Sequence, residues 1–179
     1  MKKGFLIAVA LFLFVSGAWA QIERGDSEIS FMGYYNTLVG EDVEVNGSGV
    51  FQLSYGKYIT SRLQIGIAPN LRFFLADDEQ GEKKIETDWS GSVFFNYNFS
   101  TASKFIPYIT GQYYQFTFDI PEGGEFTDYS YVNVGIGFKN FFNEYAAFNT
   151  LVSYGFSLAQ ETENKVGLLS IMTGLTFIF

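Results

Sequence analysis

Apolar and polar residues alternate with a period of two through most of the chain after residue 20, and no window there shows the repeat of an amphipathic helix. Successive side chains of a β-strand point to opposite faces, so this period predicts strands with one apolar and one polar face. In residues 27–39, for example, Ile29 and Phe31 alternate with Glu28 and Ser30. The sequence therefore predicts an all-β domain.

Eight segments carry this alternation. In chain order they are residues 27–39, 49–58, 63–75, 87–99, 105–118, 130–139, 145–158 and 169–179. In residues 105–118 both faces are partly apolar, and we assign Pro107, Ile109, Gly111 and Tyr113 to the outer one. Ten strands are the alternative count, although the length of the chain and of its connections favours eight.

The connections between these segments alternate in character. Four are long and acidic, at residues 40–48, 76–86, 119–129 and 159–166, whereas those at 59–62, 100–104 and 140–144 are short. Consecutive antiparallel strands place odd and even connections at opposite ends of a sheet. We therefore expect an up-and-down sheet with most of its negative charge at one end.

The apolar faces are too bulky for the inside of a small soluble barrel. Eight strands enclose a space that medium-sized side chains fill. If the bulky face meets lipid instead, the small and polar residues of the other face can hydrogen-bond to one another inside. The expected fold is an eight-stranded antiparallel up-and-down transmembrane β-barrel, closed because hydrocarbon offers no partner to an open edge. A secreted soluble barrel of the lipocalin type is the alternative.

The first twenty residues have the character of an export signal. Lys2 and Lys3 precede an apolar run at residues 5–15, and Ala18 and Ala20 stand three and one positions before a plausible cut. The run is short for a helix that spans a membrane, which needs about 20 residues. We predict a cleaved signal peptide at 1–20 and a barrel domain at 21–179, with an uncleaved anchor as the alternative.

The last strand carries a family resemblance. Residues Leu169, Ile171, Thr173, Leu175, Phe177 and Phe179 alternate up to a final phenylalanine. This pattern resembles the C-terminal signal of Gram-negative outer-membrane barrels. Together with the signal peptide and the eight segments, it makes the chain resemble the small outer-membrane barrels of the outer membrane protein A and X type. The resemblance implies location in the bacterial outer membrane, contact with lipid and lipopolysaccharide, and delivery by periplasmic chaperones to the barrel assembly machinery. That machinery would recognise Leu175, Phe177 and Phe179; we expect a monomer.

Composition narrows the chemistry. The chain has no cysteine and no histidine, so it lacks thiol nucleophiles, disulfides and the commonest general base. Enzymatic outer-membrane barrels resemble one another in using a catalytic histidine, so we expect no enzyme and no catalytic residue. The formal charge of -8 disfavours nucleic acid. We expect no cofactor and no specific metal site. The acidic run at residues 77–82 could hold a divalent cation, but it departs from the calcium-loop spacing.

One ion pair is expected inside the barrel. Arg72 and Asp88 fall on inward faces of neighbouring segments and come together if those segments pair around their connection. A charge inside a barrel needs a partner. The pair is either part of a polar plug, which we favour, or a gate. Glu28 should lie near the short-turn mouth, and the sequence does not name its partner.

Two functions follow from this pattern. The first is a non-enzymatic barrel with a closed polar interior that acts in envelope structure or surface interaction through its acidic extracellular loops. The second is transport, through a narrow porin-like pore or along a lateral path for small hydrophobic molecules.

Overall fold

The computed structural model describes residues 20–37, 47–77, 83–115, 130–158 and 167–179. It contains eight long strands: β2 (Ser27–Thr37), β3 (Gly47–Tyr58), β4 (Leu63–Asp77), β5 (Lys83–Asn98), β7 (Phe105–Gln115), β8 (Ser130–Phe141), β9 (Ala146–Ser157) and β10 (Gly167–Ile178). Each lies at one of the eight predicted segments. Residues 1–19, which hold nearly all of the predicted signal peptide, lie outside the described residues.

The eight strands form one closed antiparallel barrel. Each strand pairs with its neighbours in sequence, and β10 pairs with β2 to close the ring. The predicted fold class is confirmed, and the count is eight. The described residues include no helix long and apolar enough to cross a membrane.

The two faces of the barrel wall differ as the alternation predicts. Large apolar side chains point outward and are exposed in the isolated chain, among them Phe31, Ile67, Val93, Ile136 and Leu169. Small polar side chains such as Ser30, Gln64 and Thr176 point inward and are buried. The ambiguous segment is resolved as predicted, because Tyr108, Thr110 and Gln112 are buried while Ile109 is exposed. An apolar exterior around a closed sheet is the arrangement that lipid requires.

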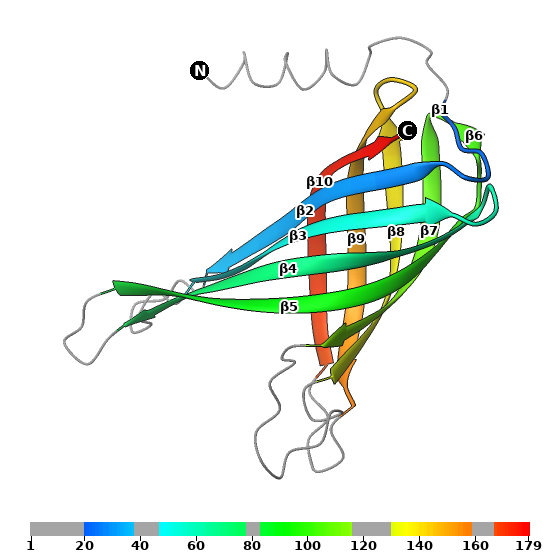
Figure 1. Cartoon of the computed structure of the whole chain (residues 1–179). Coiled ribbons are helices and arrows are strands. Elements are labelled where there is room, and N and C mark those ends of the chain that lie inside the picture. Colours follow the sequence, from blue (N-terminus) through cyan, green and yellow to red (C-terminus); the bar gives the residue numbers. More distant parts are fainter. Residues whose placement is uncertain (1–19, 38–46, 78–82, 116–129, 159–166) are drawn as a thin grey trace, which may run out of the picture.

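One end of the barrel is finished by short turns and by two short strands. There β1 (Ala20–Gln21) pairs with β6 (Ala102–Ser103), and the C-terminus lies at the same end (Figure 1). Membrane barrels have short turns on the periplasmic side and longer loops outside. By this rule the end with the short turns would face the periplasm, and we call it the periplasmic end and the opposite one the extracellular end.

The predicted loop at 76–86 is shorter than expected. β4 continues to Asp77 and β5 begins at Lys83, with these two residues paired across the hairpin. The charges in this stretch interrupt the apolar alternation, so the sequence pattern ends early. A hairpin above the membrane tolerates charged side chains because water solvates them.

Two seams of the barrel have short ladders. Residues 173–178 of β10 pair with residues 28–33 of β2, while residues 167–172 pair with β9 alone. Similarly, residues 91–98 of β5 pair with β7, while residues 83–90 pair with β4 alone. In Figure 1, β2–β5 and β7–β10 accordingly diverge from the periplasmic end as two groups. The ring is thus closed by hydrogen bonds in its periplasmic half.

Pro69 interrupts the wall in the middle of β4. It has no N–H to donate, and the pairing of β3 with β4 skips from Asn70 to Ile67. Two inward side chains compensate on the neighbouring carbonyl. Asn70 Nδ2 and Ser92 Oγ donate to the oxygen of Ala68, at 2.9 and 3.0 Å. Inward polar side chains thus supply hydrogen bonds at the place where Pro69 interrupts the backbone ladder.

Candidate functional site

The centre of the barrel's periplasmic half holds a buried ion pair. Lys139 Nζ of β8 lies 2.5 Å from Glu28 Oε2 of β2, and the two side chains are 0% and 4% exposed. Tyr58 of β3 joins them: its hydroxyl donates to Glu28 Oε2 at 2.7 Å and accepts from Lys139 Nζ at 3.0 Å. Charge pairs taken out of water are tolerated only when further hydrogen bonds satisfy them. This triad meets that condition.

Further hydrogen bonds extend the triad around the ring. Ser30 Oγ donates to Glu28 Oε1 at 3.2 Å and lies 2.6 Å from Thr176 Oγ1 of β10. Asn149 of β9 donates to Thr176 at 3.1 Å and accepts from the hydroxyl of Tyr108 of β7 at 2.9 Å. Asn98 of β5 donates to Tyr58 at 3.3 Å. We call these eight residues the polar network: Glu28, Ser30, Tyr58, Asn98, Tyr108, Lys139, Asn149 and Thr176.

The Lys139 ammonium also lies between two aromatic rings. Its Nζ is 5.6 Å from the ring centre of Tyr58 and 5.2 Å from that of Tyr108. A cation within about 6 Å of an aromatic face is attracted to it, and more strongly where water is excluded. The ammonium group is thus stabilised by a carboxylate, a hydroxyl and two aromatic rings, and an ion that crossed the barrel would have to displace it.

An apolar layer lies between this network and the periplasm. The mouth cluster consists of Ile22, Tyr58, Ile106, Phe141, Ala147 and Ile178. Ile22 belongs to the segment that precedes β2, and it is seated by the β1–β6 pairing and by its N–H, which donates to the carbonyl of Thr101 at 2.7 Å. The N-terminal segment of the barrel domain therefore covers the periplasmic mouth from below.

A second apolar layer lies on the extracellular side of the network. The middle cluster consists of Met32, Tyr108, Leu151 and Met172, with Tyr34 and Val50 packed against it. The expectation of a polar interior needs correction here, because apolar layers flank the polar one on both sides. The interior of a small β-barrel is filled by side chains, whether polar or apolar. Met32 and Met172 occupy inward positions of the alternation, so the pattern of the sequence already puts these two apolar residues inside.

The predicted pair of Arg72 and Asp88 lies nearer the extracellular end. Their backbones are register partners on β4 and β5, and Arg72 Nη2 forms an ion pair with Asp88 Oδ2. Their side chains are 24% and 48% exposed, in contrast to Lys139 and Glu28. The pair therefore stands in a part of the barrel open to solvent, and the buried charges are elsewhere.

Sequence reasoning missed Lys139 as the partner of Glu28. The signal was present, because residue 139 continues the inward positions 133, 135 and 137 and falls at the same short-turn end as Glu28. What the sequence lacks is the curvature that brings β8 opposite β2. Leu175, Phe177 and Phe179 of the predicted assembly signal are exposed on the outer face.

The described residues contain no group of three or more acidic side chains that could hold a metal ion. Residues 78–82 of the acidic run lie outside the described part of the chain, as do nearly all residues of the other long connections.

Comparison with known proteins supports the fold. No protein-family model matches the chain, and no curated protein matches its sequence. Two solved structures are similar at a TM-score of 0.50. They are the N-terminal β-barrel domain of Pseudomonas aeruginosa OprF, at 17% identity over 87% of this chain and 98% of that one, and the outer membrane protein OprG from Pseudomonas aeruginosa, at 13% identity over 89% and 98%.

These observations agree with one another. The ring closes without a free edge in its periplasmic half, the outer face is apolar, and the inner face buries its polar groups against each other. The similar structures are a β-barrel domain and an outer membrane protein. The chain therefore has the fold of the small outer-membrane β-barrels, a closed antiparallel ring of eight strands.

Proposed function

We propose that the chain is a non-enzymatic barrel whose interior is closed, and that it serves envelope structure or surface interaction. The observation that carries this proposal is the polar network between the mouth cluster and the middle cluster. The ion pair of Lys139 and Glu28 stands in the path of any solute. The polar network that it belongs to includes residues of β3, β5, β7, β9 and β10. A plug of this kind uses the interior for stability and leaves the surface for interaction.

The proposal predicts an envelope defect without a transport defect. Cells that lack the chain should take up more of a large hydrophobic dye, or attach less to surfaces, because a structural or surface component is missing. Reintroduced wild-type chain and the Arg72→Ala variant should both restore the phenotype. Normal dye uptake and normal attachment in the deletion strain would contradict the proposal.

Transport of small molecules is the second candidate, and the short seams favour it. Residues 167–172 of β10 have no ladder partner on β2, next to the apolar middle cluster. A small hydrophobic molecule could enter sideways there and rest on Met172 or Met32. Uptake of such a molecule by vesicles that hold the folded chain would support this candidate, and equal uptake by empty vesicles would exclude it.

We further propose that residues 1–20 are cleaved and that the last strand directs assembly. The mature protein isolated from cells should then begin at Gln21, and sequencing from its N-terminus tests this. Ala20 of β1 would be lost, whereas the pairing of Gln21 with Ala102 would remain.

Phe179 gives the test of the assembly signal. Its ring is exposed on the outer face, so Phe179→Ala removes little packing. We expect the variant to refold in vitro as the wild type does, and to reach the outer membrane of cells in much smaller amount. Tyr145→Ala, which removes another exposed ring at the periplasmic end, is the matched control. Equal amounts of the two variants in the membrane would argue against recognition of the terminal residue.

A further inference from the structure

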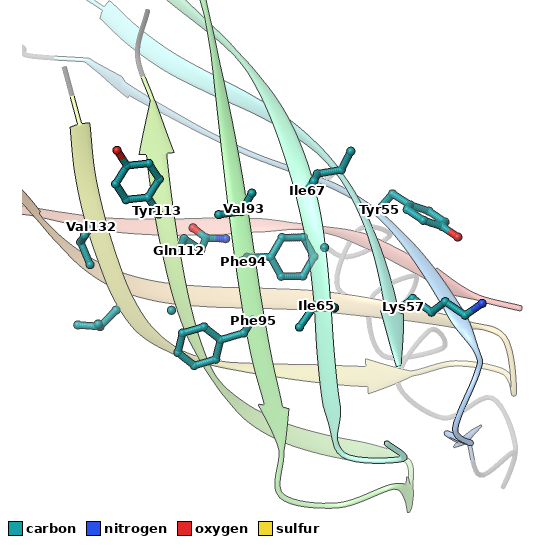
Figure 2. Close-up of a pocket in the computed structure, with 13 residues that line it drawn as sticks. Tyr55, Lys57, Ile65, Ile67, Val93, Phe94, Phe95, Gln112, Tyr113 and Val132 are labelled. Atoms are coloured by element: carbon teal, nitrogen blue, oxygen red, sulfur yellow. The ribbon is translucent and has the colours of Figure 1, made fainter. Parts of the chain in front are cut away.

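A groove of about 750 Å³ crosses the outer face of the barrel over β3, β4, β5, β7 and β8 (Figure 2). Its volume is in the range of pockets that hold small molecules. Two adjacent rows of outward side chains form most of its walls, namely Ile65, Phe95 and Val134 in one row and Ile67, Val93 and Val132 in the other. The walls are apolar, so the groove suits a hydrocarbon chain.

Gly111 and Phe95 together shape the middle of the groove. Gly111 faces outward between Phe95 of β5 and Val134 of β8, its register partners. A Cβ atom at Gly111 would lie 2.3 Å from the ring of Phe95, so that ring lies over the glycine. Because Gly111 has no side chain, the Phe95 ring occupies the space over its backbone and forms the wall of the groove there.

The groove climbs from the periplasmic interface toward the middle of the membrane. Lys57, Ile65, Phe95, Gly111 and Val134 are register partners in turn from strand to strand. Lys57 is next to the last residue of β3, whereas Val134 lies in the middle of β8. Four steps between strands span about 19 Å. Since the row is inclined to the membrane normal, this length suits one leaflet of a hydrocarbon core, about 15 Å thick.

Positive charge stands at the periplasmic end of the groove. Lys57 lines it there, exposed, with Tyr55 beside it, and Lys57 and Val132 lie at opposite ends of the view in Figure 2. Arg62, in the adjoining turn, is also exposed and donates from Nη1 to the hydroxyl of Tyr97 at 3.4 Å. Lysine places its stem on apolar surface and its ammonium at the headgroup level. An anionic headgroup here would therefore be attracted.

We propose that this groove binds one anionic glycerophospholipid of the periplasmic leaflet, with an acyl chain along the two apolar rows and the phosphate at Lys57. The inference rests on the orientation of the barrel and not on its closed interior. A lipid in this position is held by the shape of the groove and by charge at Lys57, whereas ordinary boundary lipid has neither. The bound lipid would contact strands β3 to β8 and so bridge the short ladder between β5 and β7.

Native mass spectrometry tests the proposal. Mature protein is folded into vesicles of equal parts phosphatidylglycerol and phosphatidylcholine, released in mild detergent, and compared with variants whose folding is confirmed by a gel shift on heating. Wild type should retain one phosphatidylglycerol in preference to phosphatidylcholine. Lys57→Gln should lower this preference about fivefold, the effect of one cation near a lipid surface. Gly111→Leu should abolish retention because its side chain displaces the Phe95 ring into the groove. Val134→Trp should do so independently by filling the groove with a larger ring.

Matched controls separate the groove from the rest of the surface. Arg24→Gln removes an exposed cation of the same end outside the groove, and Ile109→Leu alters an outward residue of β7 next to it. Both should retain the lipid as wild type does. Equal retention by Lys57→Gln and wild type would overturn the proposal. So would displacement of the phospholipid by lipopolysaccharide, or a second copy of the chain found cross-linked across the groove.

Discussion

Lys139→Met is expected to destabilise the barrel more than any other change of a single charge in its interior. The substitution leaves the carboxylate of Glu28 buried with Tyr58 and Ser30 as its partners and no cation. Breaking a buried pair by removing one member costs about 3–5 kcal/mol. Urea titration of the protein in lipid vesicles, followed by the gel shift on heating, measures the loss.

Two comparisons show whether burial is the cause. Arg72→Met breaks a pair of the same chemistry that is 24% and 48% exposed, and exposed pairs contribute at most about 1 kcal/mol. The double variant Glu28→Leu with Lys139→Met removes both buried charges and should regain most of the stability lost by Lys139→Met alone. If Lys139→Met and Arg72→Met lower the free energy of unfolding by the same amount, the polar network does not stabilise the barrel more than an exposed ion pair does.

Gly174→Val is expected to prevent the ring from closing. Gly174 of β10 is the register partner of Met32 of β2, and a Cβ atom there would lie 1.8 Å from the carbonyl oxygen of Phe31 and 2.7 Å from the Cα of Met32. Both obstacles are backbone atoms, which cannot rotate away. Overpacking costs about 1–3 kcal/mol even where side chains can move. The variant should therefore lose the compact band on a gel without heating.

The neighbouring residue provides the control for this variant. Thr173 lies on the outer face of the same strand and is exposed, so Thr173→Val adds no contact with β2. We expect it to fold as wild type does, with the same fraction of compact protein. Folding of Gly174→Val to the wild-type level would mean that the β10–β2 seam is not held as closely as its ladder indicates.

Most of the fold could be predicted because its determinants are local. Lipid forces large apolar residues outward at every second position, so the strands could be placed from residues such as Phe31 and Ile136 alone. Even the ambiguous strand at residues 105–115 followed this rule. Where charged residues continue a strand above the membrane, as at Asp77 and Lys83, the apolar signal stops before the strand does.

The interior was harder to predict because its contacts cross the barrel. Arg72 and Asp88 lie in one hairpin, so their register follows from the chain itself. Lys139 and Glu28 lie on β8 and β2, which are not paired, and only the curvature and stagger of the whole ring bring them together. The position of Ile22 over the mouth likewise depends on the short pairing of β1 with β6. Strands of two residues are too short to show an alternation that could be recognised in the sequence.

The central claim is that the interior is closed, and single-channel recording tests it most directly. Mature protein, shown to be folded by its gel shift, is placed in a planar bilayer under an applied voltage. The polar network and its two apolar layers predict a silent membrane at concentrations of protein that insert many copies. Discrete and reproducible conductance steps from the folded protein would contradict the account and favour a pore.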